Sequence, residues 1–553
     1  HVRTHVIILF HLFRMHPDFT KALKIMENFS KEMETQLIEN KTNDQTINLA
    51  LDTIRIGKQA LVFTNTKKSA EKTAEDMGSK IKDTTNKARL FEISEKALHA
   101  LTRPTKQCER LAKCIKNGTA FHHAGLTQKQ RELIEEEFLK GTIKIISATP
   151  TLAAGVDLPA FRTIIKDARR YGQRGLQFIP VLEYLQMAGR AGRPKYDTRG
   201  ETILIAKTEA EKDKLRDKYI YGEPENIYSK LAVEPALRFY LLSLIAGNFV
   251  RTKEQIISFF SKTYWAYQYE DMQELTSIIE RMLKLLSDFG FITSTQSGDF
   301  VTADELGDCK YTATKTGRRV SELYIDPLTA YELIKAVKRD NARGSSDFAL
   351  LHMVSFTREL RPLLRVKMRE YEHYLELSAK HEDELVVPIP TAFDYEYDEF
   401  IDSVKTASFF HEWIDERDEE YLLEKYDIRP GEIRTKIDIA DWLFYSASEL
   451  SKLLELKDVN RKLNVLRTRL KHGAREELLP LLRIRNIGRV RARKLFKNGL
   501  KDVGALKKVD LTTLQNLIGQ KTAVDVKRQL GEDLKEVPKG KRKGQLSMGK
   551  FNK

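Results

Sequence analysis

Several features that would place a chain in a common protein class are absent from these 553 residues. No apolar run approaches the roughly 18 to 20 residues that a membrane-spanning helix requires, and the stretch HVIILF at 5–10 is too short for one. The start has neither an initiator Met nor a small-residue cleavage pattern, so we expect no signal peptide. The three cysteines, Cys108, Cys114 and Cys309, fit no metal-ligand spacing and favour a reducing compartment. We therefore expect a cytoplasmic protein with no membrane partner and no metal held by protein ligands.

Two patterns of nucleotide hydrolysis are also missing. The sequence has no GxxxxGKS or GxxxxGKT loop and no DExH pattern on an apolar strand. In many ATPases these patterns hold the triphosphate and its Mg²⁺, so we expect no complete site of that kind within these residues.

Positive charge is what the sequence has in excess. It contains 94 Lys and Arg against 79 Asp and Glu, a net charge of +15, which favours a polyanionic partner such as nucleic acid. The Gly- and Lys-rich residues 532–553 read as a disordered basic tail. The length is sufficient for several domains.

Strands alternate with helices between residues 51 and 215. QALVFTNT at 59–66 reads as an apolar strand ending in a polar loop, followed by a helix. Thr127 and Gln130 form a capping box for a helix that Gly141 closes, and further strands are expected at 143–148 and 202–206. This alternation predicts an α/β domain with a parallel sheet, whose functional loops lie at the carboxyl ends of the strands.

Two glycine-containing segments carry candidate phosphate ligands. PVLEYLQMAGRAGRP at 180–194 opens with a proline and is stopped by one, and in a helix Gln186, Arg190 and Arg193 would share one bare face. Two guanidiniums and an amide on such a face favour a nucleoside triphosphate, with a solvated basic helix as the alternative. ATPTLAAGVDLPA at 148–160 supplies short hydroxyls, bare backbone and a carboxylate suited to phosphate and ribose: Thr149, Thr151, Gly155 and Asp157.

In their order, FTNT, FHHAGL at 121–126, TPTLAAGVDLP and QMAGRAGRP resemble motifs IV, IVa, V and VI of superfamily-two helicases. The similarity is to the archaeal replication-fork DNA helicases, relatives of the polymerase-theta helicase domain and of the Ski-type RNA helicases, and it covers about 61–531. The resemblance implies ATP and Mg²⁺ as cofactors, held mainly by a first RecA-like domain that precedes motif IV and is missing here. It further implies three sets of residues: Gln186, Arg190 and Arg193 for catalysis; Gly155 and Asp157, with both arginines, for the nucleotide; Thr64, Thr149 and Thr151 for the DNA backbone.

A predicted hairpin lies between motifs V and VI. Its turn glycines are flanked by Tyr171, Arg174, Leu176 and Phe178, and the resemblance implies that these side chains form a wedge between duplex strands. An ordinary surface hairpin is the alternative.

The remainder of the chain reads as mostly helical. Three helices and two short strands predict a winged helix, and a long helical stretch follows, in which Arg434 and Trp442 are i and i+8. The resemblance makes this segment a ratchet helix that contacts single-stranded bases, although a core Trp is the alternative. Two similar glycine turns, at Gly488 and Gly519, predict a helix-hairpin-helix domain that binds phosphate through its backbone and through Arg489, Arg491 and Arg493.

These observations predict an α/β RecA-like domain followed by mostly α domains. The expected division is a lead-in at 1–50, a second RecA-like domain at 51–215, a winged helix at 216–326, a helical ratchet domain at 327–480, a helix-hairpin-helix domain at 481–531 and the tail at 532–553. The expected function is the C-terminal part of an ATP-dependent 3′ to 5′ DNA helicase, a nucleoid-associated monomer that unwinds forked or lagging-strand duplex in replication-fork repair. Its expected partners are single-stranded DNA, forked DNA and other replication-fork proteins. Two alternatives stay open: a DNA-binding fragment or subunit without ATPase activity, and a Ski-type RNA helicase.

Overall fold

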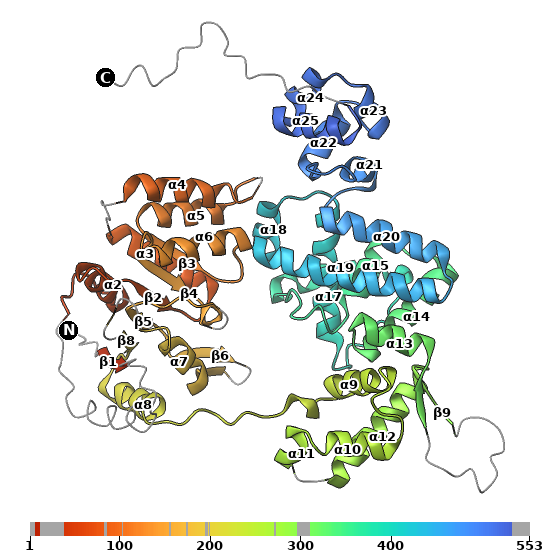
Figure 1. The fold of residues 1–553 in the computed structure, drawn as a ribbon, viewed down its shortest axis with the longest axis horizontal. Helices are drawn as coiled ribbons and strands as arrows, with labels where there is room; N and C mark the ends of the chain where they lie inside the picture. Colours follow the sequence, from red (N-terminus) through yellow and green to blue (C-terminus); the bar gives the residue numbers. More distant parts are fainter. Residues whose placement is uncertain are drawn as a thin grey trace. The chain divides into compact units, whose positions relative to one another are not determined.

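The computed structural model describes residues 6–11 and 38–532, except 82–85, 102, 154–155, 173–174, 194–196, 198–199, 270–271 and 296–309. The chain forms two compact units, and Figure 1 labels many of their helices and strands. Unit 1 comprises His1–Tyr228 and Glu419–Thr435, and unit 2 comprises Ser229–Asp418 and Lys436–Lys553. A segment about 200 residues downstream is therefore part of the first unit.

Unit 1 is built on a six-stranded sheet with the order β1-β8-β5-β2-β4-β3. Five strands run parallel, and β1 (Val6–His11) pairs antiparallel with β8 (Gly200–Ile205) at one edge. The central strands β2 (Ala60–Phe63), β4 (Ile145–Ala148) and β5 (Arg162–Ile165) are fully buried, as expected for a parallel sheet covered on both faces. The remaining strand, β3 (Thr119–His122), lies at the other edge.

Two apolar cores cover the two faces of this sheet. Side chains such as Leu61 and Phe63 pack with α4 (Lys87–Leu98), α5 (Lys106–Lys116), α6 (Gln128–Leu139), α7 (Val181–Ala188) and α8 (Glu209–Tyr219). Their neighbours Ala60 and Val62 point to the opposite face, against α2 (Gln45–Arg55) and the end of α3 (Lys67–Lys80). The predicted capping box of Thr127 and Gln130 is present at the start of α6.

The first part of unit 2 is a winged helix. It contains α9 (Glu234–Ala246), α10 (Lys253–Phe260), α11 (Tyr264–Tyr269) and α12 (Met272–Asp288), followed by the antiparallel pair β9 (Ile292–Ser294) and β10 (Tyr311–Ala313) and by α13 (Lys315–Leu323). The predicted wing strands are confirmed.

The rest of unit 2 is helical. Its longer helices are α14 (Pro327–Arg343), α15 (Asp347–Ser355), α16 (Tyr371–Lys380), α17 (Tyr397–Ile414) and α20 (Lys457–His472). Helix α19 (Pro430–Leu453) begins in unit 1, just after α18 (Glu419–Tyr426), and ends in unit 2. None of the helices in the described part of the chain has the length and apolar character needed to span a bilayer.

Five short helices form the last domain. They are α21 (Leu479–Leu482), α22 (Arg489–Lys497), α23 (Val503–Lys508), α24 (Leu511–Ile518) and α25 (Gln520–Gln529). The two predicted glycine turns occupy matching places, because Gly488 and Gly519 precede α22 and α25, and Ala492 and Ala523 lie in one buried cluster.

The predicted α/β and mostly helical architecture is confirmed. The apolar run that we noted near the start forms the edge strand β1. Six residues suffice for a strand, although they are too few for a membrane span. Most of the predicted lead-in segment 1–50 lies outside the described residues, and so does the basic tail after residue 532.

Candidate functional site

A pocket of about 580 Å³ opens at the carboxyl ends of β2 and β4. Its lining includes Thr149 and Thr151, which directly follow β4 and whose hydroxyls are 2.9 Å apart. Asn65 and Thr66, which follow β2, line it as well. Thr64, which we expected to contact DNA, has only 1% exposure and does not line the pocket. The loop after β2 therefore lines the pocket with Asn65 and Thr66, and not with Thr64.

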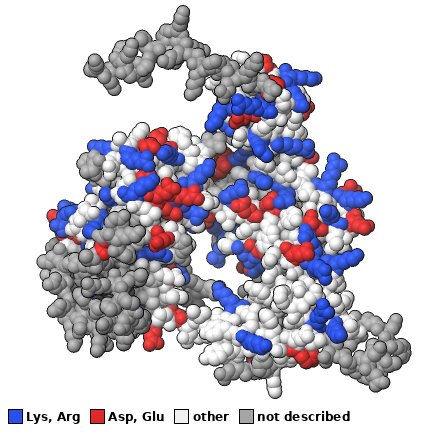
Figure 2. All heavy atoms as spheres, viewed as in Figure 1, with Lys and Arg blue, Asp and Glu red and all other residues white. Residues whose placement is uncertain are grey.

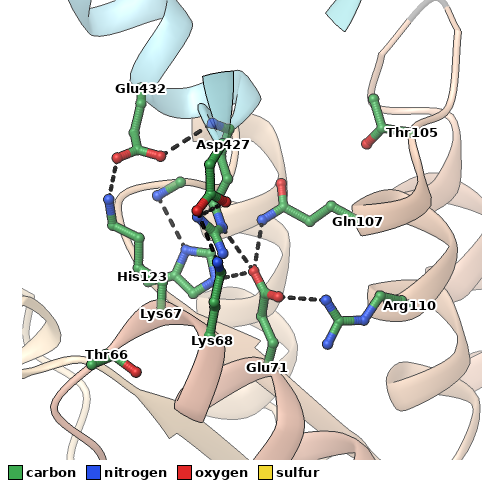
Figure 3. Close-up of polar contacts among 12 residues, drawn as sticks. Thr66, Lys67, Lys68, Glu71, Thr105, Gln107, Arg110, His123, Asp427 and Glu432 are labelled. Carbon is green, nitrogen blue, oxygen red and sulfur yellow. Dashed lines mark hydrogen bonds and ion pairs between the residues drawn. The ribbon is translucent and has the colours of Figure 1, made fainter. Parts of the chain in front are cut away.

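Four cations contribute to the lining of this strand-end pocket, and each is paired with a carboxylate; Figure 3 shows the pairs of Lys67 and Lys68, and Arg170 Nη1 donates to Glu183 Oε1 at 2.8 Å. Lys67 bonds to Glu432, and Lys68 Nζ lies 2.8 Å from Asp427 Oδ2. Arg429 Nε donates to Glu71 Oε1 at 2.9 Å. Glu432, Asp427 and Arg429 all belong to the downstream segment 419–435. Arg429, in the turn between α18 and α19, thus completes the lining, and Asp427 and Glu432 bind two of its lysines.

Glu71 is the central carboxylate of this arrangement. It is almost fully buried and receives hydrogen bonds from Arg429, from Arg110 Nη1 at 2.5 Å and from Gln107 Nε2 at 3.2 Å. Burial alone would raise the pKa of Glu71, but the hydrogen bonds from His123 and Arg429 outweigh it and hold that pKa well below its usual range. Glu71 therefore stays ionised and fixes Arg429.

His123, from the FHHAGL segment, completes the network as a neutral ring. Its Nδ1 accepts a hydrogen bond from the Gly125 backbone N–H at 3.1 Å, which places the ring proton on Nε2, 3.2 Å from Glu71 Oε1. Burial lowers the pKa of His123 more than the Glu71 carboxylate raises it. Side chains of His, Cys, Asp and Glu do not gather in threes as a metal site among the residues that the structure places.

The segment that carries Gln186, Arg190 and Arg193 differs from the single helix we expected. Helix α7 ends at Ala188, Gly189 caps it, and Gly192 has a φ of +93°. The backbone then pairs with Ala160, since Ala160 N donates to Arg190 O at 2.9 Å and Ala160 O accepts from Gly192 N at 2.6 Å. The expectation of one shared helical face is wrong, because α7 ends at Ala188, before either arginine, and the chain then pairs with Ala160 and turns at Gly192.

The three side chains consequently have separate surroundings. Gln186 is exposed on α7. Arg190 is half-buried, and its Nη2 donates to Ala153 O at 2.6 Å while its Nη1 lies 3.7 Å from Asp157 Oδ1. Arg190 and Asp157 are thus brought together, and the Asp157 side chain is 99% exposed. Gly155 lies outside the described residues.

Arg193 is held by neighbours within unit 1. Its Nε donates to Asp197 Oδ2 at 2.7 Å, and its Nη1 donates to Gln59 Oε1 at 2.6 Å. Lys58 Nζ lies 2.7 Å from the other oxygen of Asp197. The guanidinium is therefore fixed by a local carboxylate, whereas we expected it on a bare helical face.

The predicted hairpin is present as β6 (Arg169–Gly172) and β7 (Gly175–Phe178). Leu176 is 55% exposed, as a wedge residue would be. Phe178 is half-buried, with the Arg169 guanidinium 4.3 Å from its ring centroid and Tyr219 packed edge-on at 6.5 Å. The ring of Phe178 therefore packs against other residues of unit 1. Arg174 lies outside the described residues, as does the side chain of Tyr171.

Arg434 and Trp442 both lie on α19, as predicted. Arg434 is exposed, and Trp442 is half-buried with its indole N–H donating to Leu323 O at 2.9 Å. A half-buried ring leaves both earlier interpretations of Trp442 open.

The arginines of the helix-hairpin-helix domain are unequally available. Arg489 stacks over Trp413 at 4.0 Å, and Arg493 Nη2 bonds to Glu416 at 2.5 Å and to Glu477 at 2.9 Å. Arg491 is exposed and donates to Asn486 O at 2.9 Å. Gly488 has open space where a Cβ would be, so a phosphate can approach the backbone there.

The net positive charge does not gather in one region on the face shown in Figure 2, where Lys and Arg are interspersed with Asp and Glu. Total charge therefore does not locate a nucleic-acid path, and local geometry must do so. Sequence reasoning missed Glu71, Asp197 and Arg429. The two lysines directly after FTNT were a visible signal for the strand-end pocket, whereas nothing in the sequence connects them to Asp427 and Glu432.

Comparisons with known proteins agree with this organisation. The model of the helicase conserved C-terminal domain matches residues 41–195, a helix-turn-helix domain matches 200–293, and domain 4 of archaeal helicases matches 348–473. The chain is 36% identical over 520 residues to the ATP-dependent DNA helicase Hel308 of Methanocella arvoryzae, covering 92% of this chain and 67% of the relative. It is 38% identical over 506 residues to the protein of that name from Pyrococcus horikoshii, covering 90% and 67%. For the Methanococcus vannielii relative the identity is 37% over 515 residues, covering 87% and 65%. The chain thus spans about two thirds of the length of these relatives.

Proposed function

Because the chain belongs to the Hel308 family of archaeal superfamily-two DNA helicases, we propose that it forms the second RecA-like lobe and the helical DNA-handling parts of an ATP-driven motor. In this proposal the motor moves 3′ to 5′ along single-stranded DNA and unwinds forked duplex as a monomer, working with other replication-fork proteins.

The nucleotide contacts that this chain can supply are partial. Arg190 has a half-buried guanidinium beside the loop after β4, Gln186 is exposed on α7, and such groups suit the phosphates of ATP. The described residues offer no cluster of carboxylates for Mg²⁺, so the proposal assigns the metal and most of the triphosphate to a first RecA-like domain. Bound ATP supplies a phosphoanhydride whose hydrolysis releases free energy. Residues of this chain would stabilise the charge that develops on its phosphates.

The DNA path in this proposal begins at the strand-end pocket. The hydroxyls of Thr149 and Thr151 can donate to phosphate oxygens, and Lys67 and Lys68 add charge beside them. In this proposal Arg434 and Trp442 on α19, Leu176 at the hairpin edge, and Gly488 and Arg491 before and in α22 are further DNA contacts.

The observation that carries the proposal is the path of the loop 149–157. Its first residues line the pocket at Thr149 and Thr151, and its later residues contact Arg190 through Ala153 O and Asp157. One short loop therefore touches both the proposed DNA contact and the proposed nucleotide contact. A displacement of Arg190 toward ATP would therefore be transmitted through this loop to the proposed contacts with the DNA backbone.

The test is ATP hydrolysis and strand separation by the full-length protein with forked DNA, single-stranded DNA and RNA of equal length. The proposal requires turnover stimulated by single-stranded DNA and unwinding of forks with a 3′ tail. Stronger stimulation by RNA would favour a Ski-type RNA helicase.

A second candidate function is a DNA-binding module without hydrolytic activity. The missing GxxxxGKS or GxxxxGKT loop supports it for these 553 residues taken alone. The same assay on this chain separates the two, since hydrolysis without an added first lobe would contradict the second candidate.

A further inference from the structure

An acidic segment of unit 2, residues 382–402, carries two aromatic side chains that protrude into solvent. The segment has eight acidic residues and no Lys or Arg, although the whole chain has a net charge of +15. Phe393 is 99% exposed and Tyr395 is 97% exposed. Five carboxylates of the segment are exposed as well: Glu382, Asp383, Asp394, Glu396 and Asp398. Single apolar side chains on a surface are common, but two neighbouring rings with almost no protein contact indicate an interaction surface.

The loop that presents both rings is held in place by the rest of unit 2. Arg339 Nη1, on α14, donates to Val386 O at 2.9 Å, and the two prolines that follow restrict the backbone. Asp394 Oδ2 accepts from the backbone N–H of Thr391 at 2.6 Å and closes the turn. A ligand that covers the rings therefore meets a preformed surface, which lowers the entropy cost of binding.

A pocket of about 520 Å³ adjoins the same loop. Asp394, which lies between the two rings in sequence, contributes to its lining. Apolar side chains of α14 and α15 line it too, among them Leu333 and Met353. The lining also includes two arginines, of which Arg361 is paired with Glu399. The pocket thus offers a place for an apolar side chain of a ligand that binds the loop.

Charge decides which class of ligand fits. The exposed carboxylates repel the phosphates of nucleic acid, so the two rings do not form a stacking platform for DNA bases. The ligand must carry positive charge for the carboxylates and apolar side chains for the rings and the pocket. Residues 533–553, which lie outside the described residues, have this composition. They include seven Lys and Arg, two acidic residues, and the apolar side chains Leu546, Met548 and Phe551.

We propose that residues 533–553 bind the acidic segment of the same chain, with their cations on its carboxylates and an apolar side chain against the two rings and the pocket. A stretch of this length spans up to about 70 Å when extended. A compact unit of roughly 300 residues is only about 50 Å across, so the distance can be bridged. The cations cannot contact carboxylates and DNA phosphates at once, so binding here withholds them from DNA. This last step rests on the proposed DNA-binding function.

Zero-length cross-linking of the full-length protein tests the contact. The carbodiimide EDC joins a carboxylate to a lysine amine when the two are in direct contact, and peptide mass spectrometry identifies the pair. Without DNA, lysines of 533–553 such as Lys541 and Lys543 should be joined to Asp394, Glu396 or Asp398. A mixture of isotopically light and heavy protein separates contacts within one chain from contacts between two copies, since only the latter join light to heavy peptides.

The double variant Phe393→Ser with Tyr395→Ser separates the role of the rings from that of charge. It keeps every carboxylate, yet the yield of these cross-links should fall about tenfold, because two apolar contacts are lost. Phe249→Ser with Tyr267→Ser is the matched control, since these rings of the winged helix are 79% and 76% exposed and lie outside the acidic segment. The control should keep the original yield. All four positions are exposed, so both variants should fold, as circular dichroism can verify.

Single-stranded DNA should release residues 533–553 from the acidic segment. A saturating amount should lower the cross-link yield by about fivefold or more, because phosphates replace carboxylates as partners of the same cations. An unchanged yield with DNA bound would refute the withholding of these cations from DNA. A protein that binds no DNA in fluorescence anisotropy would instead refute the proposed function, and the cross-links formed without DNA would still decide whether the two segments bind each other.

Three results would overturn the inference: no cross-link between the two segments, cross-links that join only separate copies, or an equal yield in the double variant at Phe393 and Tyr395 and in its control. The first result would point to a separate basic protein as the ligand of the acidic segment. The second would point to another copy of this chain.

Discussion

Arg193 and Lys68 both lie in ion pairs within the RecA-like unit, but their partners come from very different places in the sequence. Arg193 pairs with Asp197, four residues away, whereas Lys68 pairs with Asp427, 359 residues away. The cluster of Lys58, Gln59, Arg193 and Asp197 is thus a product of residues 58–197 alone. The strand-end pocket is completed only when segment 419–435 docks on the same unit.

This difference predicts that substitutions in one region impair the function of that region and leave the function of the other intact. Changes in the Arg193 cluster should impair the nucleotide reaction and spare DNA binding. Changes around Glu71 and Arg429 should disturb the docked segment, and with it the pocket where we expect the DNA backbone. Helix α19 starts inside that segment, so its first turn should be the part most affected.

The largest expected effect is at Arg193. In Arg193→Ala, ATP turnover by the full-length protein should fall by about 10³ or more, as when an arginine that stabilises transferred phosphate charge is removed. Affinity for single-stranded DNA, measured by fluorescence anisotropy, should stay within about twofold of the original value. Arg216→Ala, which removes an arginine of α8 that pairs with the exposed Asp213, is the control and should alter neither quantity. A parallel loss of DNA affinity in Arg193→Ala would contradict the prediction that the Arg193 cluster affects ATP turnover and spares DNA binding.

The next effect is on folding, at the carboxylate that fixes the docked segment. Glu71→Gln leaves Arg429 buried without its counter-charge, so the free energy of unfolding should fall by about 3 to 5 kcal/mol. Urea denaturation followed by circular dichroism measures this change. Glu75→Gln removes the other carboxylate that binds Arg110, and since Glu75 is partly exposed the loss should be below about 1 kcal/mol. An equal loss of unfolding free energy in the two variants would mean that Glu71 contributes no more to stability than Glu75 does.

Acidification should weaken the same network through His123. Its pKa is lower in the folded protein than in the unfolded chain, so the unfolded chain takes up the proton first as the pH falls. The stability that the neutral ring contributes is fully present above about pH 6.5 and is lost below it, at up to about 1.4 kcal/mol per pH unit. The measurement is the free energy of unfolding between pH 7.5 and pH 5.5, values chosen to bracket about 6.5. His123→Gln should flatten this slope, whereas His99→Gln, at an exposed position, should leave it unchanged.

The smallest expected effect concerns the salt dependence of DNA binding. If Lys67 and Lys68 exchange their carboxylates for phosphates, the double variant to Gln should reduce the slope of log K against log salt on single-stranded DNA. The expected reduction is about 0.7 for each phosphate that the protein no longer neutralises. Asp197→Asn, in the other region, should leave this slope unaltered. An unchanged slope in the lysine variant would indicate that both ion pairs persist when DNA is bound.

The sequence alone determined the elements of the fold and the identity of the motifs. Apolar runs and caps are local properties, which is why the helix beginning after Thr127, the strands β2 and β4 and the two glycine turns before α22 and α25 were predictable. It also placed Thr149 and Thr151 at a strand end, because parallel strands expose their loops at one edge. The short run that became β1 was visible but was not interpreted as a strand, because an edge strand is recognised only by its partner.

Tertiary structure alone decided which charges meet. The spacing allowed one helix as far as Arg193, but α7 ends at Ala188, and the segment that follows pairs with Ala160 and places Arg193 beside Asp197 and Gln59. Nothing local to Lys67 or Glu71 indicates that residues 427–432 will arrive beside them. Secondary structure follows from interactions within a few residues, whereas a buried ion pair depends on the whole path of the chain between its partners.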